Sequence, residues 1–421
     1  MKRTAFIFIT FFAAGIFASC KKISVTNNTG AEWIKVISDS NVRLVGKIRA
    51  DAQNNLYCSY NYKDSVISDY SAIVKLDAKG NILWRKEFTD LSIYDFVVTP
   101  ENDVVIPSYS DGMITLIKLS SDSGTRSSGT PYALPSAAAS FKIVGMKIFI
   151  TADHNYNISG TLKKGSKKRI GFMMKMSFAD AGIWGKTFTF QSSADSTTTL
   201  TGCAEISSEF YLFGNTQMDS PKTSYFFIMK TEAVGDSMWT RTYSTSSYNP
   251  GDSSYWGYYC WTSDLIPSGD GYLFGCAYNV EYNVVNQTGI SVSTYDDKSA
   301  RIFKFSLMGD TVESAHVKLT EQNEVADLLL KKDGGLFIGL NPNVLGDVSI
   351  VFERNSFIAQ VSSNPTLAVQ SMTPIQSQYA DYLSSVCAMP DGHYAIETMI
   401  QSLGGDHYRL EVIKTDENGN F

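Results

Sequence analysis

Apolar residues along this chain occur in short runs separated by polar turns, and one such pattern recurs. In its clearest copy, at 73–84, an apolar run leads to Lys75, a turn contains Gly80, and an apolar pair precedes a tryptophan. Looser copies lie at 172–184 and 227–239. Short apolar runs between turn residues favour β-strands. Repetition of the same pattern predicts one β unit that is stacked many times.

A lysine marks the same place in most of these units. The marked positions are about 56 residues apart on average, close to the length of one blade in propeller repeats. They are Lys75, Lys118, Lys175, Lys230, Lys304, Gln360 and Lys414. The interval of 74 residues between Lys230 and Lys304 is longer than the others and predicts an insertion.

A second hairpin precedes the lysine pattern in each unit. Apolar strands flank a turn that is usually rich in Pro, Gly, Asn or Asp, as hairpins require. The seven expected turns lie at 50–55, 100–103, Val144–Gly145, 207–209, 267–271, 332–335 and 390–392. Four strands in each of seven units predict an all-β chain that forms a seven-bladed β-propeller. Six or eight blades remain open, because the units around Lys118 and Gln360 match the pattern weakly.

The two ends of the chain complement each other. The last unit ends at 416–421 without a tryptophan strand, and the stretch 31–36, which contains Trp33, looks like the missing strand. We therefore expect the N-terminal strand to pair with the C-terminal one and close the ring, which leaves no open sheet edge there. The alternative is a shortened last blade, with Trp33 in an unrelated strand.

The pattern at 73–84 resembles the tryptophan repeat of quinoprotein-type propellers, a family that includes quinone-dependent dehydrogenases and a lipoprotein of outer-membrane barrel assembly. This resemblance implies a propeller fold. The threonine that precedes glycine in that family is replaced by Lys79, and the chain has no adjacent pair of cysteines. We therefore expect no quinone and no other cofactor, and we expect the tryptophans to pack between blades.

The chain begins with basic residues, an apolar run at 5–16, and small residues before Cys20. The run is too short to span a bilayer comfortably and fits a signal peptide. Small residues before the cysteine resemble the lipobox of bacterial lipoproteins, which implies cleavage before Cys20 and lipid attachment to it. The expected parts are a signal peptide at 1–19, a lipidated tether at 20–30 and a propeller domain at 31–421. The alternative is a secreted chain in which the cysteine follows by coincidence.

The lipid expected on Cys20, the residue that follows it and the net charge of the chain help to predict where the protein is located and what it contacts. Membrane contact is expected through the lipid on Cys20, because two lipid signals hold a protein on a membrane far better than one. Lys21 stands where an aspartate is associated with inner-membrane retention. We therefore predict a cell-envelope protein on the outer membrane that faces the periplasm. The net charge of −6 gives no positive field for nucleic acid.

Motifs that carry chemistry are few. The sequence lacks His-Glu-x-x-His, Gly-x-Ser-x-Gly and Cys-x-x-Cys, so we expect no metal site and assign no catalytic residue. The pairs Asp153–His154 and Asp406–His407 have no nucleophile partner that the sequence shows. Carboxylates scattered over several blades would escape a search for motifs. The sequence thus favours a non-catalytic chain and leaves an enzyme open.

Two cysteines could form a disulfide. Apart from Cys20, five of the six cysteines remain, an odd number, so at least one is unpaired within the chain. Cys260 and Cys276 flank the turn at 267–271. If Ile266 pairs with Tyr272, the two cysteines are diagonal neighbours on one face, and a disulfide would suit an oxidising compartment. The alternative is two free thiols.

An aromatic stretch is the candidate binding surface. It lies in the same unit as the insertion 279–299 and consists of Tyr255, Trp256, Tyr258, Tyr259 and Trp261. Aromatic faces on a propeller rim can stack on sugar rings or anchor a protein partner. Alternation along a strand would instead send half of these side chains into the core.

These observations favour a lipid-anchored, non-catalytic propeller that serves as a protein-binding or scaffold module at the cell envelope. The alternatives are a lectin-like carbohydrate binder and a glycan-active propeller enzyme. A protein or a glycan is the expected partner. Exposed aromatics at 255–261 would favour the lectin, and clustered carboxylates in the central channel would favour the enzyme.

Overall fold

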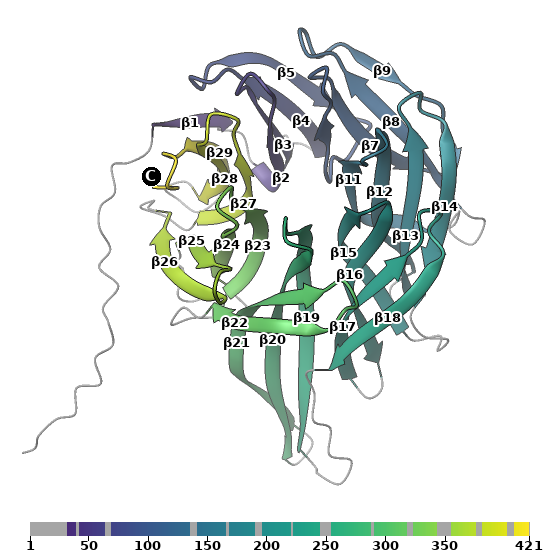
Figure 1. The fold of residues 1–421 in the computed structure, drawn as a ribbon, viewed down its shortest axis with the longest axis vertical. Helices are drawn as coiled ribbons and strands as arrows, with labels where there is room; N and C mark the ends of the chain where they lie inside the picture. The colour runs from purple at the N-terminus through teal and green to yellow at the C-terminus, as the bar shows by residue number, and fades with distance from the viewer. Residues whose placement is uncertain are drawn as a thin grey trace, which may run out of the picture.

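The computed structural model describes residues 32–38, 42–63, 69–134, 141–165, 168–189, 196–219, 222–244, 254–287, 290–317, 323–342, 355–375, 381–401 and 408–420. These residues form strands and turns and no helix. The strands make seven blades around a central axis (Figure 1), so the predicted seven-bladed β-propeller is confirmed.

Each blade runs in chain order from the axis to the edge of the ring. Blade 1 contains β2 (Val42–Ala50), β3 (Leu56–Lys63), β4 (Asp69–Leu76) and β5 (Ile82–Phe88). Blade 2 contains β6 (Val97–Val98), β7 (Val104–Ser110), β8 (Met113–Leu119), β9 (Arg126–Ser128) and β10 (Tyr132–Ala133). Blade 3 contains β11 (Lys142–Ile150), β12 (Asn155–Lys164), β13 (Lys168–Ser177) and β14 (Gly182–Phe188). Blade 4 contains β15 (Ser196–Ile206), β16 (Glu209–Asp219), β17 (Lys222–Thr231) and β18 (Ser237–Ser244). Blade 5 contains β19 (Ser254–Pro267), β20 (Tyr272–Gln287), β21 (Ile290–Ser306) and β22 (Thr311–Val317). Blade 6 contains β23 (Asn323–Leu330), β24 (Leu336–Pro342), β25 (Phe357–Ser362) and β26 (Ala368–Pro374).

Blade 7 joins the two ends of the chain. It contains β27 (Asp381–Ala388), β28 (Tyr394–Gln401), β29 (Tyr408–Lys414) and, as its outer strand, β1 (Trp33–Ser38). The antiparallel register places Trp33 opposite Lys414, as each tryptophan of blades 1, 3 and 4 lies opposite its own lysine. The predicted closure of the ring by its terminal strands is therefore confirmed.

One predicted turn is wrong. Val144–Gly145 does not end a strand but lies inside β11, where the pairing with β12 shifts between Ile143 and Gly145. The chain turns later, at Thr151–His154, where His154 takes a φ of 56°. A glycine in an apolar stretch can mark a bulge as well as a turn, and here it marks a bulge.

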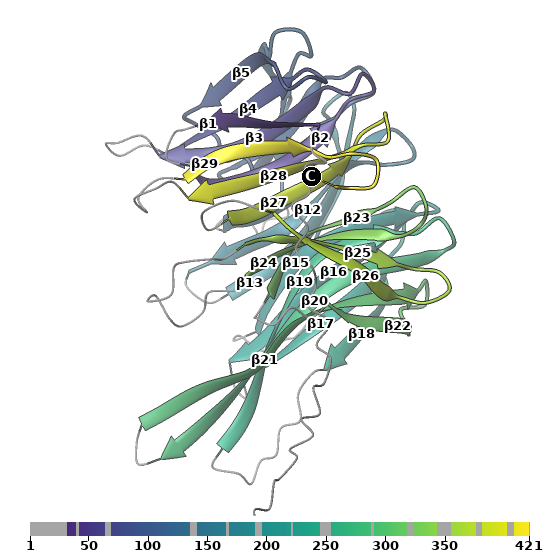
Figure 2. The ribbon, with the colours of Figure 1, turned by 90° about the vertical axis from the view of Figure 1, so that its left-hand side faces the viewer.

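The insertion predicted between Lys230 and Lys304 lengthens blade 5. Strands β19, β20 and β21 have 14, 16 and 17 residues and extend away from the ring as an arm (Figure 2). The pairing of β20 with β21 continues to Gln287 and Ile290. The arm thus departs from an otherwise compact ring of blades.

Tryptophan and glycine connect successive blades. The Trp84 ring of blade 1 lies against Gly124 of blade 2, and its Nε1 donates a hydrogen bond of 3.0 Å to the Ser121 carbonyl oxygen. Equivalent contacts join Trp33 to Gly80, Trp184 to Gly235 and Trp239 to Gly309. The expected packing of the tryptophans between blades is confirmed. An indole ring on a bare glycine backbone removes apolar area from water without a steric clash.

The lysines of the repeat form ion pairs within the blades. In several blades the lysine reaches back to an acidic residue in the first turn of its own blade. The Lys175 Nζ lies 2.5 Å from the Asp153 Oδ2, and the Lys230 Nζ lies 2.7 Å from the Glu209 Oε2. These lysines therefore connect the third strand of a blade to the turn between its first two strands.

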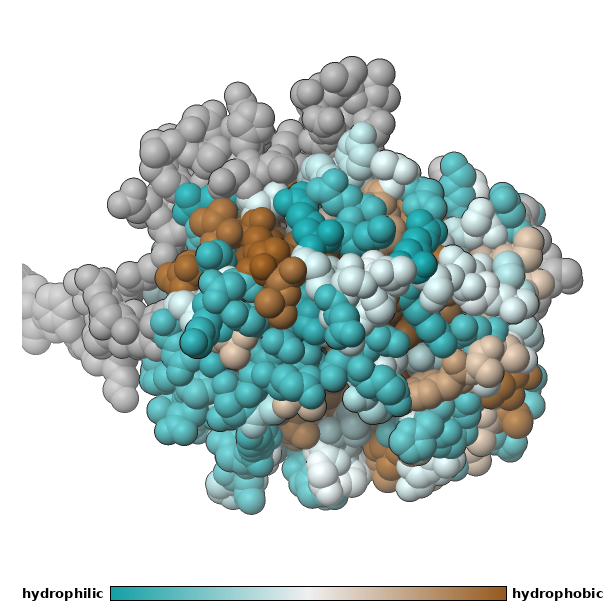
Figure 3. Space-filling model, turned by 90° about the horizontal axis from the view of Figure 1, so that it is seen from above, coloured by the Kyte–Doolittle hydropathy of each residue, from teal (hydrophilic) through white to brown (hydrophobic). Residues whose placement is uncertain are grey.

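The outer surface is mostly hydrophilic. Seen from above, it shows separate apolar clusters among polar side chains (Figure 3). Exposed apolar residues such as Ile34, Leu83 and Met238 lie on outer strands of different blades. The described residues contain no helix that is long and apolar enough to cross a membrane.

Candidate functional site

The inner strands share a distortion at the axis of the ring. Six of them pair irregularly with their neighbours, with shifts at Val45/Ile48, Ile143/Gly145, Leu200/Gly202, Thr262/Leu265, Val325/Asp327 and Leu383/Ser385. A bulge bends a strand and redirects a side chain, and bulges are common beside functional sites. Here all six occur around one cavity, which they therefore help to shape.

This axial cavity has a volume of about 410 Å³. Residues from the inner strands of blades 1, 3, 4, 5, 6 and 7 line it, with some from β12. Hydroxyl side chains are frequent in the lining and include Thr161, Thr199, Thr201, Thr262, Ser263 and Ser384. Pockets of this size hold small ligands or the end of a larger one.

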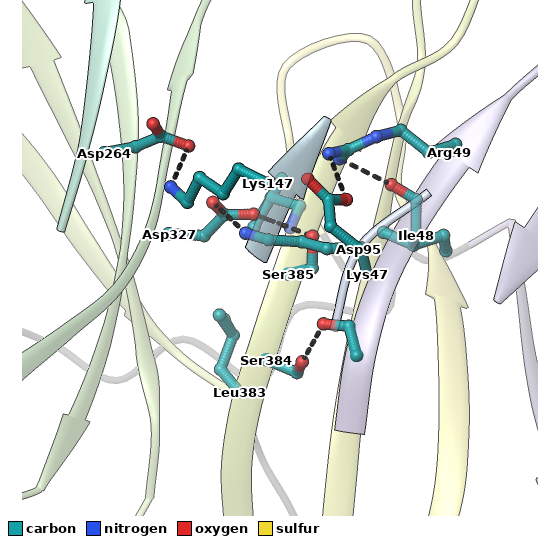
Figure 4. Close-up of polar contacts among 12 residues, drawn as sticks. Lys47, Ile48, Arg49, Asp95, Lys147, Asp264, Asp327, Leu383, Ser384 and Ser385 are labelled. Carbon is teal, nitrogen blue, oxygen red and sulfur yellow. Dashed lines mark hydrogen bonds and ion pairs between the residues drawn. The ribbon is translucent and has the colours of Figure 1, made fainter. Parts of the chain in front are cut away.

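An ion pair crosses the wall of the cavity between blades 1 and 6. The Lys47 Nζ lies 2.8 Å from the Asp327 Oδ1, and the second carboxylate oxygen accepts hydrogen bonds from the Ser385 hydroxyl at 2.7 Å and the Val386 N–H at 2.9 Å (Figure 4). Burial raises the pKa of Asp327, but the Lys47 charge and these hydrogen bonds outweigh it and leave the pKa below its ordinary value. Asp327 is therefore an ionised, fully partnered carboxylate.

Two further ion pairs connect blades near the axis. The Lys147 Nζ of blade 3 lies 2.7 Å from the Asp264 Oδ2 of blade 5. The Arg49 guanidinium of blade 1 lies 3.0 Å from the Asp95 Oδ1 in the segment that leads into blade 2, as Figure 4 shows. Asp95 also accepts the Ile148 N–H at 3.2 Å. Each of these cations thus meets an anion from a different part of the ring.

Glu324 and Tyr382 complete the polar lining. Burial raises the pKa of the Glu324 carboxyl, and no other cause contributes. Burial, with a smaller contribution from the Glu324 charge, raises the pKa of Tyr382 to about 12. Tyr382 still exposes 41% of its surface, so its ring is open to a ligand. Both groups face a cavity whose other charges are matched.

The carboxyl groups of the described lining differ in their partners. Asp264 and Asp327 are in ion pairs, so Glu324 is the one carboxyl of the described lining outside a described pair. Hydrolysis of a glycosidic bond commonly uses two carboxyl groups in defined roles. Within the described ranges, no group of three His, Cys, Asp or Glu side chains is placed to hold a metal ion.

The aromatic stretch predicted as a binding surface lies on β19. Tyr255, Trp256, Tyr258, Tyr259 and Trp261 are all in this strand, and their side chains lie outside the described residues, as does Cys20. The stretch ends directly before Thr262, which lines the axial cavity. The strand therefore continues from the predicted stretch into the cavity wall.

The predicted disulfide between Cys260 and Cys276 is not formed. Cys276 is a free, buried thiol. The strand register pairs Ile266 with Phe274 rather than Tyr272, and the shift between Thr262 and Leu265 then places Cys260 opposite Asn279. The register at the turn and the bulge in β19 together break the spacing on which the disulfide depended. Cys203 and Cys387 lie in inner strands and are also free.

No protein-family model and no curated protein sequence matches this chain. Solved structures do match. The polysaccharide lyase Uly1 aligns with a TM-score of 0.56 at 9% identity, over 92% of this chain and 100% of its own. The Dos1 propeller aligns with a TM-score of 0.50 at 9% identity, over 95% and 97%. The propeller domain of the Trilobed protease from Pyrococcus furiosus aligns with a TM-score of 0.48 at 8% identity, over 89% and 94%. Identities this low show a shared fold and nothing more.

Proposed function

We propose that this chain is a lipid-anchored, non-catalytic propeller that serves as a binding or scaffold module at the cell envelope, with the axial cavity as its ligand site. The matched charges of the cavity carry this proposal. Lys47 with Asp327, and Lys147 with Asp264, hold inner strands of different blades in fixed positions. Such a site is rigid, and rigidity lowers the free energy lost on binding.

Other parts of the chain would connect this site to its surroundings. Lipid on Cys20 would hold the ring beside the outer membrane through the tether at 20–30. The arm formed by β19, β20 and β21 extends from the ring and offers a scaffold surface for a protein partner. The axial cavity and the arm share strand β19, so a ligand and a partner would contact one continuous element.

A plugged cavity tests the proposal. Gly145 lines the cavity, and a Cβ added there meets nothing within 4 Å, so we expect the side chain of Gly145→Trp to occupy the cavity. Gly269, in the exposed turn before β20, is equally free of neighbours and gives the matched control Gly269→Trp. We expect the lipidated wild type and the control to capture the same molecule from detergent-solubilised envelope, and the plugged variant to lose it. Equal capture by all three would contradict an axial site.

A glycan-active enzyme is the second candidate, and Glu324 favours it. A carboxyl group whose pKa is raised by burial can act as a general acid, and Glu324 lines the cavity. Wild type and Glu324→Gln should be incubated with envelope glycans and the products analysed by mass spectrometry. The proposed binding module leaves the glycans intact in both. Shortened glycans with the wild type, but not with Glu324→Gln, would establish the enzyme instead.

A further inference from the structure

Polar groups in the axial cavity give the ligand a recognisable chemistry. Hydroxyl groups both donate and accept hydrogen bonds, and so they match a ligand that carries hydroxyl groups of its own. Several are held in place by the protein. The Thr201 and Thr262 hydroxyls, from blades 4 and 5, share a hydrogen bond of 2.6 Å. The Ser384 hydroxyl of blade 7 donates to the Gly46 carbonyl oxygen at 2.7 Å and keeps its lone pairs as acceptors.

The charges of the cavity disfavour a charged ligand. An anion that bound Lys47 or Lys147 would compete with Asp327 or Asp264 for its partner. A cation would separate the same pairs from the other side or would need Glu324 as its partner, and burial disfavours the charged form of Glu324 by raising its pKa. Breaking the Lys47–Asp327 pair is especially costly, because Asp327 is buried and would be left without compensation. An uncharged ligand leaves both pairs intact.

An aromatic face stands beside these hydroxyl groups. Tyr382 lines the cavity on β27 and exposes 41% of its surface. The apolar residues Leu200, Leu383 and Met146, all nearly fully buried, also belong to the lining. The cavity thus combines an apolar surface with several fixed hydrogen-bonding groups, as ligand sites commonly do. A sugar ring has the matching pair of properties, with an apolar face of C–H groups and an edge of hydroxyl groups.

We propose that the axial cavity binds a sugar unit at the end of an uncharged glycan, with its ring face on Tyr382 and its hydroxyl groups on Thr201, Thr262 and Ser384. This inference rests on the proposed function and names the ligand of the same site. The chain end of a glycan fits better than an internal unit, because the cavity holds about 410 Å³ and inner strands of six blades line its wall.

Calorimetric titration tests the ligand class. The lipidated full-length chain is kept in a detergent without a sugar headgroup, since a maltoside or glucoside would compete for the site. It is titrated with a panel of neutral trisaccharides of glucose, galactose and mannose, and with trigalacturonic acid and triglucosamine as charged counterparts. At least one neutral trisaccharide should bind more tightly than both charged ones. The inference is overturned if no neutral trisaccharide binds, or if a charged one binds best.

Variants locate the sugar. Binding should weaken at least tenfold in Gly145→Trp and in Tyr382→Ala, and stay near wild type in Gly269→Trp and Tyr382→Phe, since the latter keeps the ring. Unchanged thermal unfolding would show that each variant is folded. Neutral sugar that binds Gly145→Trp as tightly as wild type would contradict the axial position. If an envelope molecule is captured through the cavity but no neutral sugar binds, the proposed function stands and the sugar inference falls.

Discussion

Trp84 donates its Nε1 proton to the carbonyl oxygen of Ser121 in the next blade, at 3.0 Å. The same ring lies against Gly124, where an added Cβ would come within 3.1 Å of it. The contact of a tryptophan ring with a glycine of the next blade repeats at three other junctions and explains the tryptophan of the repeat. The blades are thus joined at their outer edges by tryptophan contacts, while the inner strands are joined by ion pairs at the axis.

We predict that Gly124→Ala destabilises the ring by about 1–3 kcal/mol. Its φ of +63° strains any other residue, and the new methyl group would push the Trp84 ring outward. Urea unfolding followed by tryptophan fluorescence measures the shift in midpoint. Gly145→Ala is the control, because a Cβ there meets nothing within 4 Å. Equal midpoints for the two variants would contradict the role given to this contact.

Asp327→Ala should destabilise the protein by about 3–5 kcal/mol, because it leaves Lys47 in a buried position without its partner. The double variant Lys47→Met with Asp327→Leu should recover much of this loss, since no charge is then buried. Thermal unfolding of the wild type and the variants, including each single change, gives the coupling energy. Additive effects of the single changes would show that the two side chains act independently.

Acid should weaken the contact between Lys175 and Asp153. Burial acts to raise the pKa of Asp153, but hydrogen bonds from Lys175 and Thr151 outweigh it and lower the pKa from 3.8 to about 2. A carboxyl whose pKa is lower in the folded state stabilises the fold above its unfolded pKa. That contribution is lost as the pH falls from about 4 to about 2.

The pH dependence of unfolding checks this contribution. Lys175→Met should lose less stability than the wild type over the same pH interval. Without Lys175 the pKa of Asp153 lies closer to its unfolded value, so less stability depends on the ionised carboxylate. Lys86→Met, on outer strand β5, is the matched loss of a positive charge and should follow the wild type. Parallel curves for Lys175→Met and the wild type would contradict the assignment.

Cys20→Ala should move the protein from the membrane fraction to the soluble fraction, because it removes the proposed lipid attachment. Fractionation of cells and labelling with a radioactive fatty acid measure both effects. Cys58→Ala is the control for loss of a thiol, since Cys58 is a buried residue of β3. A Cys20→Ala protein that still takes up the label and stays in the membrane would exclude the proposed anchor.

The sequence predicted the ring because its signals are local. In the clearest units a lysine, a glycine turn and a tryptophan lie close together in the sequence, so these units could be recognised by themselves and the weaker ones by their spacing. The same reasoning misplaced one turn, because Gly145 marks a bulge in β11 and a bulge shows only in strand pairing. The predicted disulfide also depended on strand pairing, since the register at the turn and the bulge after Thr262 change which residues are opposite each other.

The axial site could not be predicted from the sequence. Lys47 and Asp327 are 280 positions apart and pair only because the ring brings blades 1 and 6 near each other around blade 7. Thr201 and Thr262 look like ordinary strand residues until their strands converge at the axis. A signal did exist in part, because polar residues interrupt the apolar inner strands at the bulged positions. These polar residues can be assigned to one cavity only when the strand register is known.

The central claim is that ligand binds on the axis of the ring. An experimental structure of the lipidated full-length chain with the molecule that it captures from the envelope tests this most directly. The account predicts ligand density in the axial cavity, in contact with Tyr382, Ser384 and Thr201, with the Lys47–Asp327 pair intact. Ligand density on the outer rim or on the arm, together with a cavity that contains only solvent, would contradict it.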